Sequence, residues 1–122
     1  MRVISGQFKG RRLKAPSWHG LRPTSDKLRE TLFNILAPRI DGARVLDGFA
    51  GTGAIGVEAM SRGAAHVTFI EHDRRAAALI EANLTLCRAK QGYTIECGDV
   101  ASVLQRPRGD AACDLVLLDP PY

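Results

Sequence analysis

Two different spacings of apolar residues divide the chain near Arg44. Upstream of it, the apolar positions fall at i, i+4, i+7 and i+8, namely Leu28, Leu32, Ile35 and Leu36. This spacing places them on one face of a helix. Thr24 or Ser25 can cap the start of that helix, and Pro38 is expected to close it.

Downstream of Arg44, short apolar runs alternate with stretches of helical spacing. The predicted strands and helices are, in chain order, Arg44–Asp47, Ala54–Ser61, His66–Glu71, Arg74–Ala89, Tyr93–Cys97, Val100–Gln105 and Asp114–Asp119. Strands that alternate with helices form a parallel sheet joined by right-handed crossovers. The sequence therefore predicts an α/β fold.

Charge is distributed unevenly along the chain. The first 44 residues hold ten lysines and arginines against three acidic residues, a net charge of +7, whereas the remainder holds seven basic and ten acidic residues, a net −3. The basic part begins with a predicted hairpin whose short strands are Arg2–Gly6 and Arg11–Lys14. Charge alone leaves two interpretations open, a polyanionic partner and a solvated basic surface.

The composition limits the class of protein. With 122 residues, 45% of them hydrophobic, the chain has enough apolar surface for one folded domain. The longest apolar run falls far short of the roughly 20 residues that cross a bilayer, and the N-terminus lacks the apolar segment of a secretory signal. Cys87, Cys97 and Cys113 are too widely spaced for a disulfide framework or zinc site and are expected to be buried, reduced thiols. We expect a cytoplasmic monomer that binds neither metal nor membrane.

Residues 45–56, VLDGFAGTGAIG, carry the strongest local signal. A buried strand ends at Asp47, passes through a glycine-rich bend and enters a helix. Gly51 and Gly53 let the backbone approach a ligand closely, at the carboxyl edge where open α/β sheets bind ligands. The sequence therefore predicts a ligand site here, in preference to a plain strand–helix connection.

The same stretch matches the GxGxxG dinucleotide fingerprint, with Glu71 about where a ribose-binding acid should lie. That fingerprint normally follows its strand at once, so that the pyrophosphate rests on the helix N-terminus. Here Asp47 and three further residues intervene. An acid at the strand end suits a positive amino group rather than a diphosphate, which favours S-adenosylmethionine.

Two further acids follow the next two predicted strands. Glu71 ends the second strand, and Asp99 follows the third. Together with Asp47, they could meet the amino group, the ribose hydroxyls and the adenine amine of such a cofactor. Each could instead cap a helix, and for Asp99 this alternative is nearly as strong.

The fourth predicted strand runs into Asp119, Pro120, Pro121 and Tyr122. The two prolines remove two backbone donors, so the turn offers only acceptors. Acceptors from the Asp119 carboxylate and the Pro120 carbonyl would localise the lone pair of an exocyclic base amine and aim it at an electrophilic methyl group. Tyr122 would stack on the flipped base. The alternative is a proline-stiffened strand exit.

Four segments of the chain carry a family resemblance. They are residues 3–13 (VISGQFKGRRL), 22–36 (RPTSDKLRETLFNIL), 46–54 (LDGFAGTGA) and 119–122 (DPPY). Over essentially its whole length, the chain resembles the bacterial 16S ribosomal RNA guanine-N2 methyltransferases of the small-subunit methyltransferase D type. The last two segments are general to amino-methyltransferases, whereas the first two are specific to this family.

The resemblance implies a Rossmann-like, S-adenosylmethionine-dependent methyltransferase fold with an N-terminal β-hairpin. It implies methyl transfer to the N2 amine of a guanine in 16S ribosomal RNA, free or in the small ribosomal subunit. The implied cofactor contacts are Asp47, Phe49, Gly51, Gly53, Glu71 and Asp99, with Thr24 near the methionine end. The implied target-amine site is Asp119, Pro120, Pro121 and Tyr122. The implied contacts with RNA phosphates are Lys9, Arg11, Arg12 and Lys14.

The resemblance divides the chain into a basic hairpin and loop, residues 1–23, and a methyltransferase domain, residues 24–122. The family's domain continues past the DPPY motif with further strands, so we expect an incomplete sheet here that does not catalyse alone. Two other functions remain open. They are a DNA adenine or cytosine amino-methyltransferase and a non-catalytic nucleotide- or RNA-binding fragment. The hairpin, and the lack of room for a DNA-reading domain, favour the RNA enzyme.

Some residues are assigned ordinary structural roles. Phe33 and Met60 are expected in the core, and Glu58 and Glu81 on solvated helix faces. Trp18 is expected either to pack against the first helix or to stack on a base.

Overall fold

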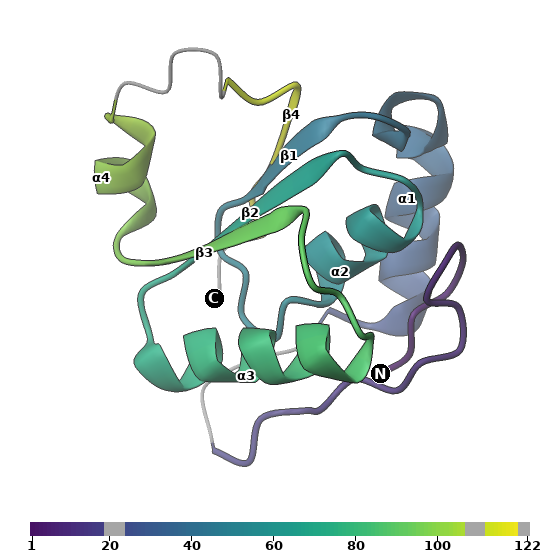
Figure 1. The fold of residues 1–122 in the computed structure, drawn as a ribbon, viewed down its shortest axis with the longest axis horizontal. Helices are drawn as coiled ribbons and strands as arrows, with labels where there is room; N and C mark the ends of the chain where they lie inside the picture. The colour runs from purple at the N-terminus through teal and green to yellow at the C-terminus, as the bar shows by residue number, and fades with distance from the viewer. Residues whose placement is uncertain (19–23, 107–111, 120–122) are drawn as a thin grey trace.

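The computed structural model describes residues 1–18, 24–106 and 112–119 (Figure 1). The strands are β1 (Arg44–Asp47), β2 (His66–Glu71), β3 (Tyr93–Cys97) and β4 (Leu115–Leu117). The helices of the described part are α1 (Asp26–Ile40), α2 (Ala54–Ser61), α3 (Arg74–Leu86) and α4 (Val100–Leu104). The strands form one parallel sheet in the order β3-β2-β1-β4, which confirms the predicted α/β class.

The two faces of the sheet are covered to different extents by the rest of the chain. Val45 and Phe69 belong to the main core, together with buried residues of α1, α2 and α3. Their neighbours Leu46 and Ile70 point to the opposite face, because successive strand residues alternate, and pack there with Val103 of α4. Figure 1 accordingly shows α4 on the other side of the sheet from α1 and α2.

The strand order creates a switch point between β1 and β4. The chain proceeds from β1 outward to β2 and β3, then returns to place β4 on the free side of β1. Asp47 is in register with Leu117, and the Gly48 N–H donates to the Leu117 carbonyl at 2.9 Å. Ligands of open α/β folds bind at the carboxyl ends of strands at such a point.

Helix α1 begins as predicted and ends later. The Ser25 hydroxyl accepts the Leu28 N–H at 3.1 Å, which makes Ser25 the cap. Pro38 does not close the helix, which continues to Ile40. A proline so near the end removes only one intrahelical bond, and the burial of Ile40, 1% exposed, offsets that loss.

The face that α1 buries matches the predicted one only in part. Leu32 and Leu36 are partly buried against the main core, as predicted, whereas Leu28 and Ile35 are 58% and 72% exposed. The buried residues of α1 are Arg29, Phe33 and Ile40. The prediction missed this part of the buried face because it counted only the regularly spaced apolar residues. Arg29 lies on the buried face, where carboxylates compensate its charge.

The N-terminal arm, residues 1–18, folds back on itself next to α2. Arg2 and Arg12 form an antiparallel bridge, and the Val3 N–H donates to the Arg11 carbonyl at 3.0 Å. The predicted hairpin is therefore present as a single bridge and not as two extended strands. Val3, Phe8 and Leu13 reach into the main core, so the arm packs against the rest of the molecule.

Glu58 of α2 explains why the hairpin strands stay short. Its carboxylate accepts the N–H groups of Ile4 and Ser5 at 2.9 and 3.1 Å, so these donors are not used in strand pairing. The Nε atoms of Arg62 and Arg29 lie 2.9 and 3.6 Å from the same carboxylate. Glu58 is fully buried, and the expected solvated position is wrong.

The remaining element bounds agree with the predicted ones at most positions. Strands β1, β2 and β3 and helix α2 have the predicted limits. Helix α3 ends before the predicted Ala89, because Arg88 turns to a positive φ of 58° and the Ala89 N–H donates back to the Leu84 carbonyl. Helix α4 is one residue shorter than predicted, and β4 keeps only the centre of its predicted range.

Candidate active site

Asp47 lies at the carboxyl end of β1 and is 1% exposed. Its Oδ2 accepts the Gly56 N–H at 3.1 Å, while its Oδ1 is buried with no hydrogen-bond partner among the described residues. Burial raises the pKa of Asp47 to about 7, and the nearby carboxylates of Asp119 and Glu71 add to this rise. The orphaned oxygen fits a ligand that brings an N–H donor to this point.

The glycine loop that follows β1 approaches the same point. Gly51 and Gly53 have φ values of +55° and +82°, which side chains rarely tolerate. The Gly51 N–H donates to the Glu71 carboxylate at 3.1 Å, which joins the loop to β2. Phe49 is half-buried in this loop. The loop therefore presents backbone beside Asp47 and Glu71, as expected for a cofactor-binding bend.

Glu71 and Asp99 differ in their present partners. Glu71 is 6% exposed, and besides Gly51 its carboxylate accepts the Asp73 N–H at 2.8 Å. Asp99 is exposed and caps α4 by accepting the Ser102 N–H at 3.2 Å. The helix-cap interpretation of Asp99 is confirmed, and its contact with a cofactor adenine stays a prediction.

Asp119 follows β4 and completes a group of three carboxylates at this edge. It is exposed, and its Oδ2 accepts the Thr24 hydroxyl at 2.6 Å. Thr24, expected beside a cofactor, therefore contacts the residue expected to hold the target amine. Pro120, Pro121 and Tyr122 lie outside the described residues.

The predicted RNA-contact residues lie in the N-terminal arm. Lys9, Arg11, Arg12 and Lys14 are all exposed. The end of the arm is fastened to α3 by the buried Asn83, whose side chain accepts the Lys14 N–H at 2.6 Å. The same side chain donates to the Thr52 carbonyl in the glycine loop at 2.9 Å.

Sequence reasoning missed the anchoring roles of Arg29, Glu58 and Asn83. These are the large charged or polar side chains with 0% exposure in the described part of the chain. A signal was available for Asn83, since it is next to Leu84 and three residues after Ile80, two apolar residues at helical spacing. Trp18 also has a different partner from the expected first helix, because Arg75 of α3 lies 4.7 Å from its ring centroid.

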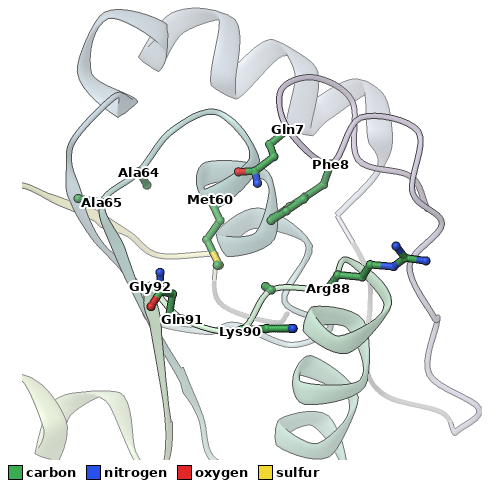
Figure 2. A pocket seen from close by; sticks show the side chains of 10 residues that line it. Gln7, Phe8, Met60, Ala64, Ala65, Arg88, Lys90, Gln91 and Gly92 are labelled. Atoms are coloured by element: carbon green, nitrogen blue, oxygen red, sulfur yellow. The ribbon is translucent and has the colours of Figure 1, made fainter.

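A separate cavity of about 580 Å³ lies away from these carboxylates (Figure 2). It is lined by side chains of the arm, of α2 and of the segments that precede β2 and β3, including Phe8, Met60 and Lys90. Because those segments enter the strands, the cavity lies at the amino edge of the sheet. No predicted cofactor contact lines it.

The described residues include no group of three or more histidines, cysteines or acids that could hold a metal ion. None of their helices is long and apolar enough to cross a membrane. All three cysteines are free, but only Cys87 is buried as expected, whereas Cys97 is exposed and Cys113 is half-buried.

The parallel sheet with its flanking helices has the Rossmann-like fold of S-adenosylmethionine-dependent methyltransferases. The S-adenosylmethionine-dependent methyltransferase from Agrobacterium tumefaciens superposes with a TM-score of 0.68 at 26% identity, covering 90% of this chain and 36% of that one. A hypothetical protein of Thermus thermophilus superposes with a TM-score of 0.85 at 31% identity, covering 100% of this chain and 70% of that one.

Within this class, the chain belongs to the family described as conserved hypothetical protein 95, whose profile matches residues 1–122. It is 44% identical to ribosomal RNA small subunit methyltransferase D of Haemophilus influenzae and 43% identical to that of Escherichia coli K12. Both matches cover 100% of this chain, which spans 64% and 60% of the lengths of those two relatives. The family resemblance drawn from the motifs is confirmed.

Proposed function

We propose that the protein transfers a methyl group from S-adenosylmethionine to the exocyclic N2 amine of a guanine in 16S ribosomal RNA. The S–CH3 bond breaks as the N–CH3 bond forms, so that the sulfonium becomes a neutral thioether and the nitrogen loses one proton. The observation that carries this proposal is that three carboxylates lie close together at one edge of the sheet, those of Asp47, Glu71 and Asp119. It is supported by the 44% identity to a ribosomal RNA small subunit methyltransferase D.

The cofactor would lie along the carboxyl ends of β1 and β2. Asp47 would accept the cofactor amino group on its orphaned oxygen, and Glu71 would accept the ribose hydroxyls. The backbone of Gly51 and Gly53 would pass close to the ligand. At Gly53 the absent side chain also leaves room for Ile80 of α3, which an added Cβ would meet at 3.2 Å. When bound, S-adenosylmethionine supplies an electrophilic methyl group on a positively charged sulfur.

The target amine would lie beside Asp119. An exocyclic amine is a poor nucleophile because its lone pair is delocalised into the base. A carboxylate that accepts one N–H bond orients the nitrogen and opposes that delocalisation. The sequence motif adds the Pro120 carbonyl as a second acceptor and Tyr122 as a stacking surface. Positioning of this kind can contribute roughly 7–11 kcal/mol to catalysis.

The ribosomal RNA would be bound by the basic arm. The four basic residues assigned to this role, Lys9, Arg11, Arg12 and Lys14, are all exposed. Contacts of lysine and arginine with phosphates fix the register of a nucleic acid without reading its sequence. The arm packs against α2 and α3, so RNA held there has a defined position relative to the sheet.

Methyl transfer is tested with tritium-labelled S-adenosylmethionine and three acceptors, namely 16S RNA, small ribosomal subunits and duplex DNA. We expect label in the RNA or the subunits, and N2-methylguanosine after digestion and mass spectrometry. Label in DNA alone would show a DNA methyltransferase. Cofactor and RNA binding without transfer would show a binding protein, and either result contradicts the proposal.

Replacing Asp119 tests its role in holding the amine. We expect Asp119→Ala to lower kcat by roughly 10²–10⁴-fold, the range typical of a lost catalytic side chain, with the cofactor Kd unchanged. Asp114→Ala is the matched control, because this exposed aspartate precedes β4 at its opposite end, where its carboxylate accepts the Arg44 N–H. Full activity of the Asp119 variant would refute the assigned role.

A further inference from the structure

The Thr24 hydroxyl makes an unexpected contact at the candidate active site. It donates to the Asp119 Oδ2 at 2.6 Å, across a separation of 95 residues in sequence. Hydroxyl donors to carboxylates are at their strongest at 2.5–2.7 Å, because the acceptor is charged. The segment that precedes α1 is therefore linked to the acid that follows β4.

We propose that Thr24 is a positioning residue for Asp119, an inference that rests on the proposed function. The hydroxyl engages one carboxylate oxygen, Oδ2. The other oxygen, Oδ1, has no hydrogen-bond partner within the described part of the chain. Thr24 thereby fixes the rotation of the carboxylate and leaves Oδ1 to accept an N–H of the guanine amine.

Thr24 is itself held in place by α1. Its carbonyl accepts from Arg29 Nη1 at 3.3 Å, and the next residue, Ser25, caps the helix. Arg29 is fully buried, and its guanidinium lies 2.9 Å from Asp26 and 3.6 Å from Glu58. A buried guanidinium with several partners cannot shift easily, so the Thr24 backbone has a defined position relative to β4.

The Arg29 guanidinium also donates to the carbonyl of Arg2 in the N-terminal arm. Glu58, its second carboxylate partner, accepts the Ile4 and Ser5 N–H groups. The buried Arg29–Glu58 ion pair therefore holds both the N-terminal arm and Thr24. The proposed RNA-binding segment and the proposed amine site share this support.

The location of the Thr24–Asp119 contact argues for a role in the site more than in folding. Asp119 is exposed and Thr24 only half-buried, and hydrogen bonds at such positions contribute little to stability. A misplacement of about 1 Å at a reacting group, in contrast, can reduce a rate by about 10²-fold. Loss of the hydroxyl is therefore expected to affect turnover and to leave folding intact.

The kinetic test removes the hydroxyl and keeps the side-chain shape. We expect Thr24→Val to lower kcat by roughly 10–100-fold, with KM for RNA and Kd for S-adenosylmethionine near the wild-type values. Thr24→Ser restores the hydroxyl and should recover most of kcat. Thr31→Val is the matched control, since Thr31 is an exposed α1 threonine whose hydroxyl donates only within its own helix.

Two kinetic results with Thr24→Val would overturn the proposal. One is a Thr24→Val protein with wild-type kcat. The other is a loss that appears as weaker cofactor binding, because Thr24 would then be a cofactor contact. A Thr24→Ser protein as slow as Thr24→Val would equally exclude a role for the hydroxyl.

A structural measurement separates this proposal from the proposed function. In crystal structures we expect one orientation of the Asp119 carboxylate in the wild type and several in Thr24→Val. The same single orientation in both would refute positioning by Thr24, whatever the acceptor. A wild type with an ordered Asp119 that methylates no RNA would refute the proposed function and leave the positioning role intact.

Discussion

Asp47 combines three properties that rarely occur in one carboxylate. It is fully buried, one of its oxygens has no partner among the described residues, and its pKa is raised to about 7. Burial is the main cause, since removal from water disfavours the charged form. Near neutral pH, the protonation of Asp47 is therefore sensitive to any charge that binds beside it.

This sensitivity predicts a pH-dependent affinity for S-adenosylmethionine. The cofactor's ammonium group favours the ionised carboxylate, so binding below pH 7 should release a proton from Asp47. We expect the affinity to rise by up to about tenfold per pH unit between pH 5 and 7 and to level off above. Calorimetry in two buffers of different ionisation enthalpy measures the released proton directly.

Asp47→Asn provides the control for that experiment. The amide cannot ionise, so the variant should bind the cofactor more weakly, and its binding should release no proton at this position. An unchanged pH profile in Asp47→Asn would show that another group titrates. It would also show that Asp47 does not meet the cofactor's amino group.

The spacing of apolar residues along the sequence predicts the roles of some single residues and fails to predict the roles of others. The strand-end positions of Asp47 and Glu71 follow from short apolar runs that end in an acid, and their meeting follows from the parallel order of strands. Glu58 was expected in solvent and is buried. Its partners are backbone N–H groups more than 50 residues away and two arginines. Only Arg62, four residues further along α2, could be found from a local i,i+4 pattern.

Among the elements, α2 depends on the absence of a side chain at Gly56. An added Cβ would lie 2.2 Å from the Phe69 ring, so the helix packs directly on β2. The same close approach allows the Gly56 N–H to reach Asp47. The glycine therefore serves both helix packing and the position of the site carboxylate.

We expect Gly56→Ala to lower the free energy of unfolding by about 1–3 kcal/mol, because overpacking displaces α2 from the sheet. Gly98→Ala is the control, since a Cβ there meets only an ordinary contact at 3.9 Å from Val103. It should change stability by less than about 0.5 kcal/mol. Urea unfolding of both variants measures the difference, and equal stability of the two would contradict the packing argument.

The elements themselves were largely predictable, but the orientation of α1 was not. Three strands and α2 were predicted with their observed bounds because local periodicity determines them. The buried face of α1 contains Arg29, and ion pairs with Asp26 and Glu58 make its burial possible. A prediction from apolar spacing places no charged residue in the core. For α1 it therefore selects the face that contains Leu28 and not the face that contains Arg29.

At the scale of the whole molecule, charge is segregated. The first 44 residues carry a net +7 and the rest a net −3. The basic arm lies beside α2 and α3, whereas the clustered carboxylates occupy the carboxyl edge of the sheet. A long polyanion could therefore be held by the arm, while a small cationic ligand would be attracted to the sheet edge.

Replacing Lys9, Arg11, Arg12 and Lys14 with glutamine tests the arm. We expect weaker binding to 16S RNA and a shallower dependence of log K on log salt, by about 0.7–0.9 for each phosphate that the arm no longer neutralises. Cofactor affinity should not change. Lys27→Gln with Arg39→Gln, two exposed α1 cations, is the control. Equal slopes for the arm variant and the wild type would exclude the arm as the RNA-binding segment.

The position of β4 beside β1 has a consequence for synthesis on the ribosome. Strands β1, β2 and β3 pair in chain order, so they can assemble with α1, α2 and α3 before β4 has been made. Asp119 joins the site only when β4 adds to the free side of β1, and its contact with Thr24 spans 95 residues of sequence. Such distant contacts form late, because closing a long loop is entropically costly. A nascent chain would acquire the Asp47 and Glu71 half of the site first, and the amine-binding half only after β4 has been made.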